Sequence, residues 1–361
     1  MTLPARAVGL GLVLVAALPA APAAAKHPRA LLAHTASGGR PDGTAIDPAM
    51  SGDGRMARWA SYASTARDIV GGAGTHRNVY LVQRKGPFSS RGTPWVQKRT
   101  ILATRGQGGP ADGDSWGGTF DGVRYSQNDR TVAPRCFAFV SAATNLVHGD
   151  GDGKADVFVR RLAGGRLVRL ASSAGATEAD LDGSCKTIAF VAGGVARIAS
   201  PAGGGKARAI SGPGASSVQL SADGHTATYE RGGAVWVWRR GKARRLVTGQ
   251  DPTSDGFGRY VSYRRGSAVL RAELTGPLRE RSLRSNSGAR VVATTPLSMT
   301  AGGSFVFFGH GAQVDSNAYR NFAVCPSAGA SVTKVSGSAQ GNYAVYSCST
   351  GDVWITYLGP S

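Results

Sequence analysis

Residues 135–141 read RCFAFVS, and residues 186–192 read KTIAFVA. The two stretches align without gaps, and each carries an aromatic residue at its fifth position, two residues after an apolar one. Side chains two residues apart lie on the same face of a β-strand, so each stretch predicts a strand with one buried apolar face. Five more stretches share the pattern: 55–61, 225–231, 259–265, 304–310 and 342–348. The seven aromatic positions are Trp59, Phe139, Phe190, Tyr229, Tyr263, Phe308 and Tyr346.

A second apolar column follows each of these stretches. It falls in the segments 78–82, 156–160, 194–198, 234–238, 268–272, 321–325 and 352–356. The second residue of these segments is Val, except in unit six, where it is Phe322. A further basic or mixed segment, such as 166–172, completes a four-stranded antiparallel sheet. Such sheets repeated around an axis form a β-propeller, because no single sheet covers its own faces. The sequence therefore predicts an all-β, seven-bladed β-propeller, with six blades as the alternative.

The ends of the repeat region indicate how the ring closes. The last unit ends near Tyr357 without room for an outer strand, whereas residues 29–37 offer one. An N-terminal strand paired into the last sheet would remove an exposed edge. The interval between Trp59 and Phe139 is the longest, and we expect an inserted glycine-rich loop there, at about 106–118, and no eighth blade. Residues 26–361 are thus expected to form a single β-propeller domain.

Residues 1–25 have the features of a secretory signal peptide. Arg6 precedes a short apolar run from Val8 to Leu18, and small residues then lead to Ala25. The run is too short to span a bilayer. We therefore expect the mature chain to be a monomer, secreted or held in the periplasm or cell envelope, with no transmembrane segment.

The cysteines are even in number: Cys136, Cys185, Cys325 and Cys348. In an oxidising compartment this predicts two disulfides, for which three connectivities exist. We expect pairing between neighbouring blades, 136 with 185 and 325 with 348, because these positions lie at the ends of strands in adjacent units.

The chain is strongly basic, with 42 Lys and Arg against 22 Asp and Glu and a formal net charge of +20. Such a field attracts anionic partners. Export makes nucleic acid the least expected of them, so the expected partners are a cell-envelope protein or an anionic wall polymer. A general basic surface without a specific partner is the alternative. The run RRGKARR at 239–245 is either a polyanion patch or, the simpler interpretation, protection of an outer strand edge.

One segment resembles a known family. Residues 145–165, NLVHGDGDGKADVFVRRLAGG, are similar to the N-L-V segment, the G-D-x-x-G-x-x-D loop and the D-V-F-V strand of TolB-like bacterial β-propeller repeats. The similarity is best over 126–172 and partial over 51–84. The other units are similar only in their turn and aromatic columns. The resemblance implies a secreted or periplasmic binding scaffold, often without catalysis, and it names no ligand.

The loops between the two columns predict where a partner binds. They are short in units three, four, five and seven, and long in units six, one and two, which are near neighbours in a closed ring. Function on a rigid scaffold concentrates in such loops. The candidate ligand-binding residues there are His76, His148, His310, Asp68, Asp315 and Arg320. The alternative is that these polar residues simply favour exposed loops.

The loop of unit two also suggests a metal site. Asp150, Asp152 and Asp156 form D-x-D-G-x-x-D and could supply oxygen ligands to calcium. His148 stands where a calcium loop normally begins with an acid, and imidazole suits calcium poorly. The alternative is a set of turns that needs no ion. Apart from calcium, no cofactor is expected.

We therefore expect a secreted, non-enzymatic β-propeller that binds a protein, peptide or cell-envelope polymer through the long loops of blades six, one and two. The alternative is a secreted hydrolase or lyase acting on a polysaccharide or peptide. In that case His148 and His310, with Asp68 or Asp315, would supply the acid and the base, provided that they converge. The motif GDSWG at 113–117 lacks the strand–turn–helix context of a nucleophile elbow, so no catalytic residue is assigned.

Overall fold

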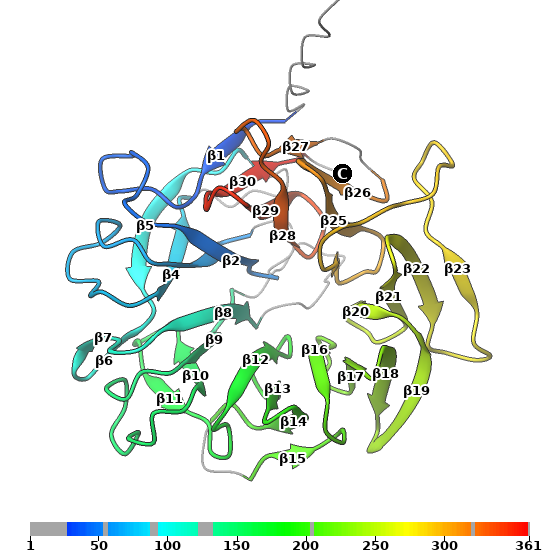
Figure 1. Ribbon diagram of the computed structural model, residues 1–361, viewed down its shortest axis with the longest axis horizontal. Helices are drawn as coiled ribbons and strands as arrows, with labels where there is room; N and C mark the ends of the chain where they lie inside the picture. Colours follow the sequence, from blue (N-terminus) through cyan, green and yellow to red (C-terminus); the bar gives the residue numbers. More distant parts are fainter. Residues whose placement is uncertain are drawn as a thin grey trace, which may run out of the picture.

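Seven four-stranded antiparallel sheets stand in a ring around a central axis (Figure 1). The computed structural model of the chain describes residues 27–52, 57–86, 93–121, 133–202, 206–318 and 322–359. These residues contain strands and turns and no α-helix. The predicted seven-bladed β-propeller is therefore confirmed. The signal peptide expected at 1–25 lies outside the described residues.

Each blade runs from an inner strand at the axis to an outer strand at the perimeter. The inner strands are β2 (Ala45–Met50), β8 (Ser115–Phe120), β12 (Ala176–Leu181), β16 (Ala215–Leu220), β20 (Gln250–Ser254), β24 (Ser298–Met299) and β28 (Val332–Gly337). The second strands are β3 (Trp59–Ser64), β9 (Cys136–Ser141), β13 (Ile188–Ala192), β17 (Thr226–Arg231), β21 (Tyr260–Arg265), β25 (Val306–His310) and β29 (Tyr343–Cys348).

The third strands are β4 (Asn78–Arg84), β10 (Asp156–Arg161), β14 (Val195–Ala199), β18 (Ala234–Arg239), β22 (Ala268–Glu273), β26 (Gln313–Ser316) and β30 (Val353–Tyr357). The outer strands are β5 (Gln97–Leu102), β11 (Leu167–Arg169), β15 (Arg208–Ala209), β19 (Lys242–Thr248), β23 (Glu280–Ser282), β27 (Ala323–Val324) and β1 (Arg29–Leu31). Blade one begins with β2, and blade seven consists of β28, β29, β30 and β1.

The N-terminal strand closes the ring, as predicted. Strand β1 pairs with β30, with Ala30 opposite Ile355, and so supplies the outer strand of blade seven. The amide of Leu32 continues the pairing with a hydrogen bond to the carbonyl of Val353 at 2.8 Å. The strand itself ends at Leu31, so only the first part of the predicted segment 29–37 is extended.

An apolar cluster fills each of the seven interfaces between blades, and each cluster contains one ring of the aromatic column. Burying such a side chain contributes about 1.5–3 kcal/mol, which explains why the column recurs in every unit. In blade one the ring is Tyr62, which lies opposite Tyr80 as Phe139 lies opposite Phe158. The assignment of Trp59 to this column was wrong. Trp59 lies at the start of β3 and packs in the next cluster, between blades one and two.

The segment predicted as an inserted loop, 106–118, contains two elements. Strands β6 (Arg105–Gly106) and β7 (Gly109–Pro110) form a short hairpin, but residues 115–118 belong to β8, the inner strand of blade two. The inserted-loop prediction was therefore wrong for 115–118, because glycines there accommodate a bulged strand beside the axis. Ser115 of GDSWG is buried and donates a hydrogen bond to the hydroxyl of Ser141 at 2.8 Å, which is a structural contact.

Blade six differs from the prediction in the position of its third strand. Its third strand is β26, joined to β25 by a two-residue turn, and the segment 321–325 contributes only β27, the outer strand. The predicted long loop of blade six was therefore wrong.

Both disulfides form as predicted, 136 with 185 and 325 with 348, with Cα–Cα distances of 6.0 and 5.8 Å. Each bridge joins two neighbouring blades. In the described part of the chain we find no helix with the length and apolar character needed to cross a bilayer.

Candidate functional site: the mouth of the central channel

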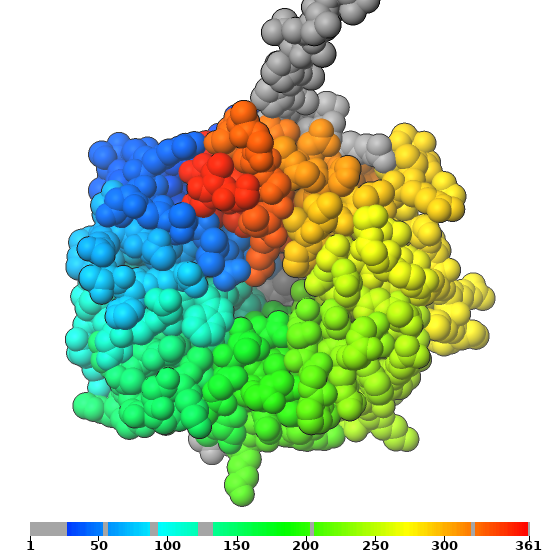
Figure 2. Space-filling view, viewed as in Figure 1, coloured from blue at the N-terminus to red at the C-terminus, as the bar shows by residue number. Residues whose placement is uncertain are grey.

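The inner strands begin on the same face of the ring as the turns between second and third strands. Neighbouring strands are antiparallel, so each second strand ends beside the start of its inner strand. The long loops of blades one and two, 65–77 and 142–155, therefore flank the start of the inner strands. The ring is hollowed at its centre (Figure 2). This face carries the candidate site.

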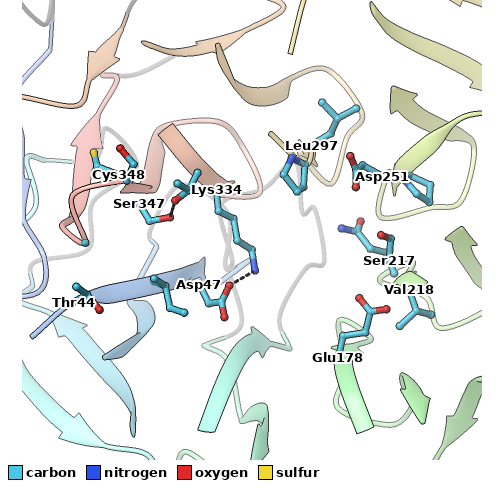
Figure 3. Close-up of a pocket in the computed structure, with 17 residues that line it drawn as sticks. Thr44, Asp47, Glu178, Ser217, Val218, Asp251, Leu297, Lys334, Ser347 and Cys348 are labelled. Carbon is cyan, nitrogen blue, oxygen red and sulfur yellow. Dashed lines mark hydrogen bonds and ion pairs between the residues drawn. The ribbon is translucent and has the colours of Figure 1, made fainter. Parts of the chain in front are cut away.

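A cavity of about 640 Å³ opens at the start of the inner strands, and six of the seven blades line it (Figure 3). A second cavity of about 470 Å³ continues along the axis and shares Asp47, Glu178 and Lys334 with the first. A volume of this size is typical of a ligand site. We call the first cavity the channel mouth.

Bulges in the inner strands shape the channel mouth. The pairing register shifts within the inner strand of every blade except blade six. At three of these bulges a non-glycine residue adopts a left-handed backbone: Asp47 with φ 51°, Ser217 with φ 53° and Asp251 with φ 51°. This conformation costs about 1–2 kcal/mol for an ordinary residue, and Asp tolerates it better than most. Bulges commonly redirect side chains next to a site, and these three residues line the cavity.

A polar contact crosses each of the seven interfaces between blades, in the inner half of the ring. Such contacts fix the positions of the inner strands relative to one another, so the cavity wall is rigid. The pairs are Asp47–Gly117, Thr119–Asp180, Asp180–Leu220, Glu230–Asp251, Thr253–Met299, Ser298–Gly337 and Lys334–Asp47.

Three carboxylates and one ammonium line the channel mouth. Lys334 Nζ lies 3.5 Å from Asp47 Oδ1, and the guanidinium of Arg264 donates to Asp251 Oδ2 at 2.6 and 2.8 Å. Glu178 has no cationic partner at contact distance among the described residues. Its carboxylate accepts hydrogen bonds from the backbone amides of Ser217 and Val218, and burial raises its pKa. Figure 3 shows Glu178 and Asp251 on one side of the cavity and the Asp47–Lys334 pair across it.

Asp180 lies deeper in the channel and has a structural role. Its carboxylate accepts from the Thr119 hydroxyl at 2.7 Å and from the Leu220 amide at 2.8 Å, so it joins blades two, three and four. Burial raises the pKa of Asp180 to about 6. The protonation state of this cross-link therefore changes close to neutral pH.

The residues predicted in the loop of blade one mainly hold loops together. Asp68 is exposed and accepts a hydrogen bond from the Asp42 amide at 3.1 Å. His76 is exposed, and its Nδ1 lies 3.7 Å from Asp114 Oδ1, which also accepts from the Arg77 amide at 2.9 Å. These contacts attach the loop of blade one to its neighbouring segments.

The remaining predicted ligand-binding residues do not gather at one place. His148 is exposed in the loop of blade two, and His310 is exposed at the end of β25 in blade six. Asp315 is buried within β26, opposite Phe308. Arg320 lies outside the described residues. Blade seven separates His310 from the loop of blade one, so the predicted three-loop cluster is reduced to blades one and two.

The three aspartates proposed for calcium do come together, within 4.8 Å of one another. A protein cation lies in the same place, because Arg169 Nη1 is 2.8 Å from Asp150 Oδ1 and 3.3 Å from Asp156 Oδ2. The same guanidinium donates to the Gly149 carbonyl at 3.0 Å. One buried oxygen, Asp150 Oδ2, has no hydrogen-bond partner. Oxygen ligands fit calcium chemically, but the ion would have to displace Arg169.

Asp47, Glu178, Asp251 and Lys334 were not among the residues predicted from the sequence. The available signal was the dipeptide Asp-Pro at 47–48 and again at 251–252, in the same place of two units. Proline is favoured at bulges and aspartate tolerates a left-handed backbone, so this dipeptide could have predicted an irregular strand. A repeated Asp-Pro ahead of the aromatic column marks the bulged inner strand.

No family model and no curated protein sequence matches the chain. Among solved structures, the β-propeller domain of Cps50 (Swd1) from Myceliophteria thermophila has a similar fold, with a TM-score of 0.52 and 10% sequence identity. The similarity covers 88% of this chain and 97% of that one. At this identity the similarity shows the β-propeller fold alone.

Proposed function

We propose that the chain is a non-enzymatic binding scaffold that works outside the cytoplasm and holds a positively charged segment of a protein or peptide in its channel mouth. The observation that supports this is the charge of the lining. The mouth carries three carboxylates and one ammonium in a chain with 42 basic and 22 acidic residues. Among the described residues that line the two cavities there is no arginine.

Glu178 is the residue on which the proposal depends most. Asp47 and Asp251 each have a cation of the protein at contact distance. Glu178 accepts hydrogen bonds from backbone amides and forms no ion pair among the described residues, although the charge of Lys334 acts on it across the cavity. A guanidinium or ammonium from a ligand would complete its pairing with a charge-assisted hydrogen bond in a partly desolvated place. Because burial raises the pKa of Glu178, its carboxylate becomes neutral at a higher pH than that of an ordinary glutamate, and capture should weaken on acidification.

The loops of blades one and two stand on the same face and supply a rigid flank for a larger partner. Their attachment to neighbouring segments supports a protein or peptide as the ligand, because a preformed surface loses little entropy on binding. Two interblade disulfides favour an oxidising compartment, and a cell-envelope protein is the expected partner there. The TolB-like resemblance of residues 126–172 supports the same role.

The proposal is tested with matched peptides and one isosteric substitution. Short arginine-containing peptides are compared with twins in which citrulline, a neutral isostere, replaces arginine, and affinities are measured by fluorescence anisotropy. We expect arginine peptides to bind about tenfold tighter, since a charge-assisted pair contributes about 1.5 kcal/mol or more. Glu178→Gln should remove this preference. Glu273→Gln, the same change at the end of β22 on the opposite face, should leave it intact. Equal binding of both peptides to the unmodified protein would refute the proposal.

A further inference from the structure

The perimeter between blades three and four carries a second feature, distinct from the channel mouth. Strand β15 has only two residues, Arg208 and Ala209, whereas the neighbouring outer strand β19 has seven. The described residues leave a hollow between this short strand and the face of blade four. A cavity of about 290 Å³ remains there, lined by Arg208, Arg231, Trp236 and Trp238 among others. We call it the arginine groove.

Two tryptophans hold two arginines in place. The guanidinium carbon of Arg231 lies 5.4 Å from the ring centre of Trp236, and that of Arg208 lies 5.6 Å from Trp238. Arg231 Nε also donates to the Pro213 carbonyl at 3.0 Å. A stacked guanidinium is ordered in advance and keeps N–H groups at its edge for an oxyanion. The tryptophans are two residues apart on β18, so both lie on the same face of the sheet, about 7 Å apart along the strand.

A third arginine joins the same face. Arg245 pairs opposite Trp236 in the β18–β19 ladder, so their side chains project from the same side of the sheet. It is exposed. The turn before it adds Arg239, Arg240 and Lys242, which line a further surface hollow. Arg239 and Lys242 lie opposite each other in the ladder and project from the other face of the sheet, so the turn adds positive charge near the groove without lining it.

None of these six cations pairs with a carboxylate in the described part of the chain. Arginines of other blades do find acids: Arg135 with Asp121, Arg259 with Asp255, and Arg265 with Glu280. Edge protection alone requires charge on the strand but does not require arginines stacked on indole rings. The stacking and the lack of acids together point to an external anion.

We propose that the arginine groove binds an anionic polymer of phosphodiester-linked polyol units. Planar guanidiniums match phosphate oxygens in a bidentate geometry, and two of them lining one groove suit a polymer that carries a phosphate in every repeat. Nucleic acid shares the phosphodiester, but single-stranded binding sites normally offer free aromatic faces for the bases. Here guanidiniums cover a face of each ring. This inference is independent of the function proposed for the channel mouth.

The test uses the full mature chain and deacylated poly(glycerol phosphate) attached by one end to a biosensor. The groove variant combines Arg208→Gln, Arg231→Gln and Arg245→Gln. The control combines Arg279→Gln, Arg281→Gln and Arg290→Gln, three exposed arginines at the outer edge of blade five. Both variants lose the same charge. We expect at least a tenfold loss of affinity for the groove variant and less than about a twofold loss for the control, at physiological salt where distant charges are screened.

Two further arms make the result specific. Arg208→Lys with Arg231→Lys keeps the charge but loses the planar fork, and we expect about threefold weaker binding or worse. Arg245→Gln alone, at an exposed position, remains informative if the triple variant is unstable, and it should weaken binding about twofold to threefold. Equal losses in the groove and control triples would overturn the proposal in favour of a general basic surface. Tighter binding of a single-stranded DNA of equal charge would overturn the assignment to a polyol-phosphate polymer.

Discussion

The channel mouth and the arginine groove are two charged regions of opposite sign on one ring, and they are built differently. At the mouth, bulged inner strands press against neighbours on both sides, and polar contacts hold nearly every charged group. At the groove, Arg208 of the outer strand β15 and Arg231 at the end of β17 rest on indole rings, and neither pairs with a carboxylate among the described residues. The inner part of a propeller is thus constrained to satisfy its own charges, whereas the perimeter can leave them available.

An acid without an ion pair at the mouth is therefore stronger evidence for an external ligand than several unpaired cations at the edge. Among the described residues Glu178 forms no ion pair, in a region where its neighbours Asp47 and Asp251 each form one. Removing a cation elsewhere in the interior should therefore be costly. The loop of blade two offers the sharpest case.

The largest expected effect is on the stability of that loop. In Arg169→Gln, the buried carboxylates of Asp150 and Asp156 lose their cation, and breaking such a buried pair costs about 3 kcal/mol. Chemical denaturation should show this loss, whereas Arg166→Gln, an exposed change in the same turn, should cost less than about 0.5 kcal/mol. Calcium should then stabilise the Arg169 variant and leave the unmodified protein unchanged. A loss of unfolding free energy below about 1 kcal/mol would mean that buried acids of the ring remain stable without a cationic partner. The proposed difference between the interior and the perimeter would then be refuted.

The next prediction concerns the axis of the ring. Burial raises the pKa of Asp180 to about 6, above the ordinary value of 3.8, so the native state holds a proton that the unfolded state has released between those values. Stability should therefore fall as pH rises from about 4 to about 6, by at most about 1.4 kcal/mol per pH unit from this group. Asp180→Asn should remove the contribution of this group to the slope. Its amide oxygen can still accept from the Leu220 amide, its NH2 group can donate to the Thr119 hydroxyl oxygen, and the side chain does not ionise.

Denaturation midpoints measured across this pH range will decide the point. Asp152→Asn, a change of an exposed carboxylate, serves as the control and should leave the slope as it is. An unchanged slope in the Asp180 variant would show that the acids of the channel are solvated. The channel would then resemble the perimeter more than the interior.

The repeat itself was predictable because each interface needs one buried ring. Phe139 and Phe190 recur at the same place after the same turn, and both fill interfaces between blades. The gapless alignment failed in blade one, where Trp59 stands three residues before the true column residue, Tyr62. Trp59 and Tyr62 lie on opposite faces of β3, and each of them fits the aromatic position of the pattern. Only the pairing with the third strand distinguishes them.

The candidate site was harder to predict, because the inner strands lack hydrophobic alternation. Segments such as 45–50 and 250–254 contain bulges, prolines and acids, and they do not read as strands. The third strand of blade six was missed for a related reason. The segment 321–325 imitates the Val column more closely than β26 does, so the short turn after His310 was read as a long loop. Loop length, and with it the position of the site, depends on strand boundaries that periodicity alone does not fix.

The smallest expected effect is a gain of affinity at the channel mouth. Lys334 is the one cation among the described residues that line the mouth. In Lys334→Gln that charge is lost, and Asp47, whose side chain is 29% exposed, becomes available to a ligand. A partly exposed pair contributes about 0–1 kcal/mol to stability, so the ring should remain folded. Arginine peptides should then bind about threefold tighter, since a positive charge that repels them has been removed from a partly desolvated cavity.

The direction of this change is what distinguishes a charge effect from damage to the site. A disturbed cavity wall would lower the affinity for arginine peptides, whereas the removal of a repelling cation raises it. His76→Ala, on the loop of blade one at the same face, should change the affinity less than about twofold, because that side chain contacts Asp114 and lies outside the cavity lining. If Lys334→Gln weakens binding, or if His76→Ala changes it more than Lys334→Gln does, the ligand sits on the loops and not in the mouth. The charge difference between the channel mouth and the perimeter would then be a property of the fold that does not locate the binding site.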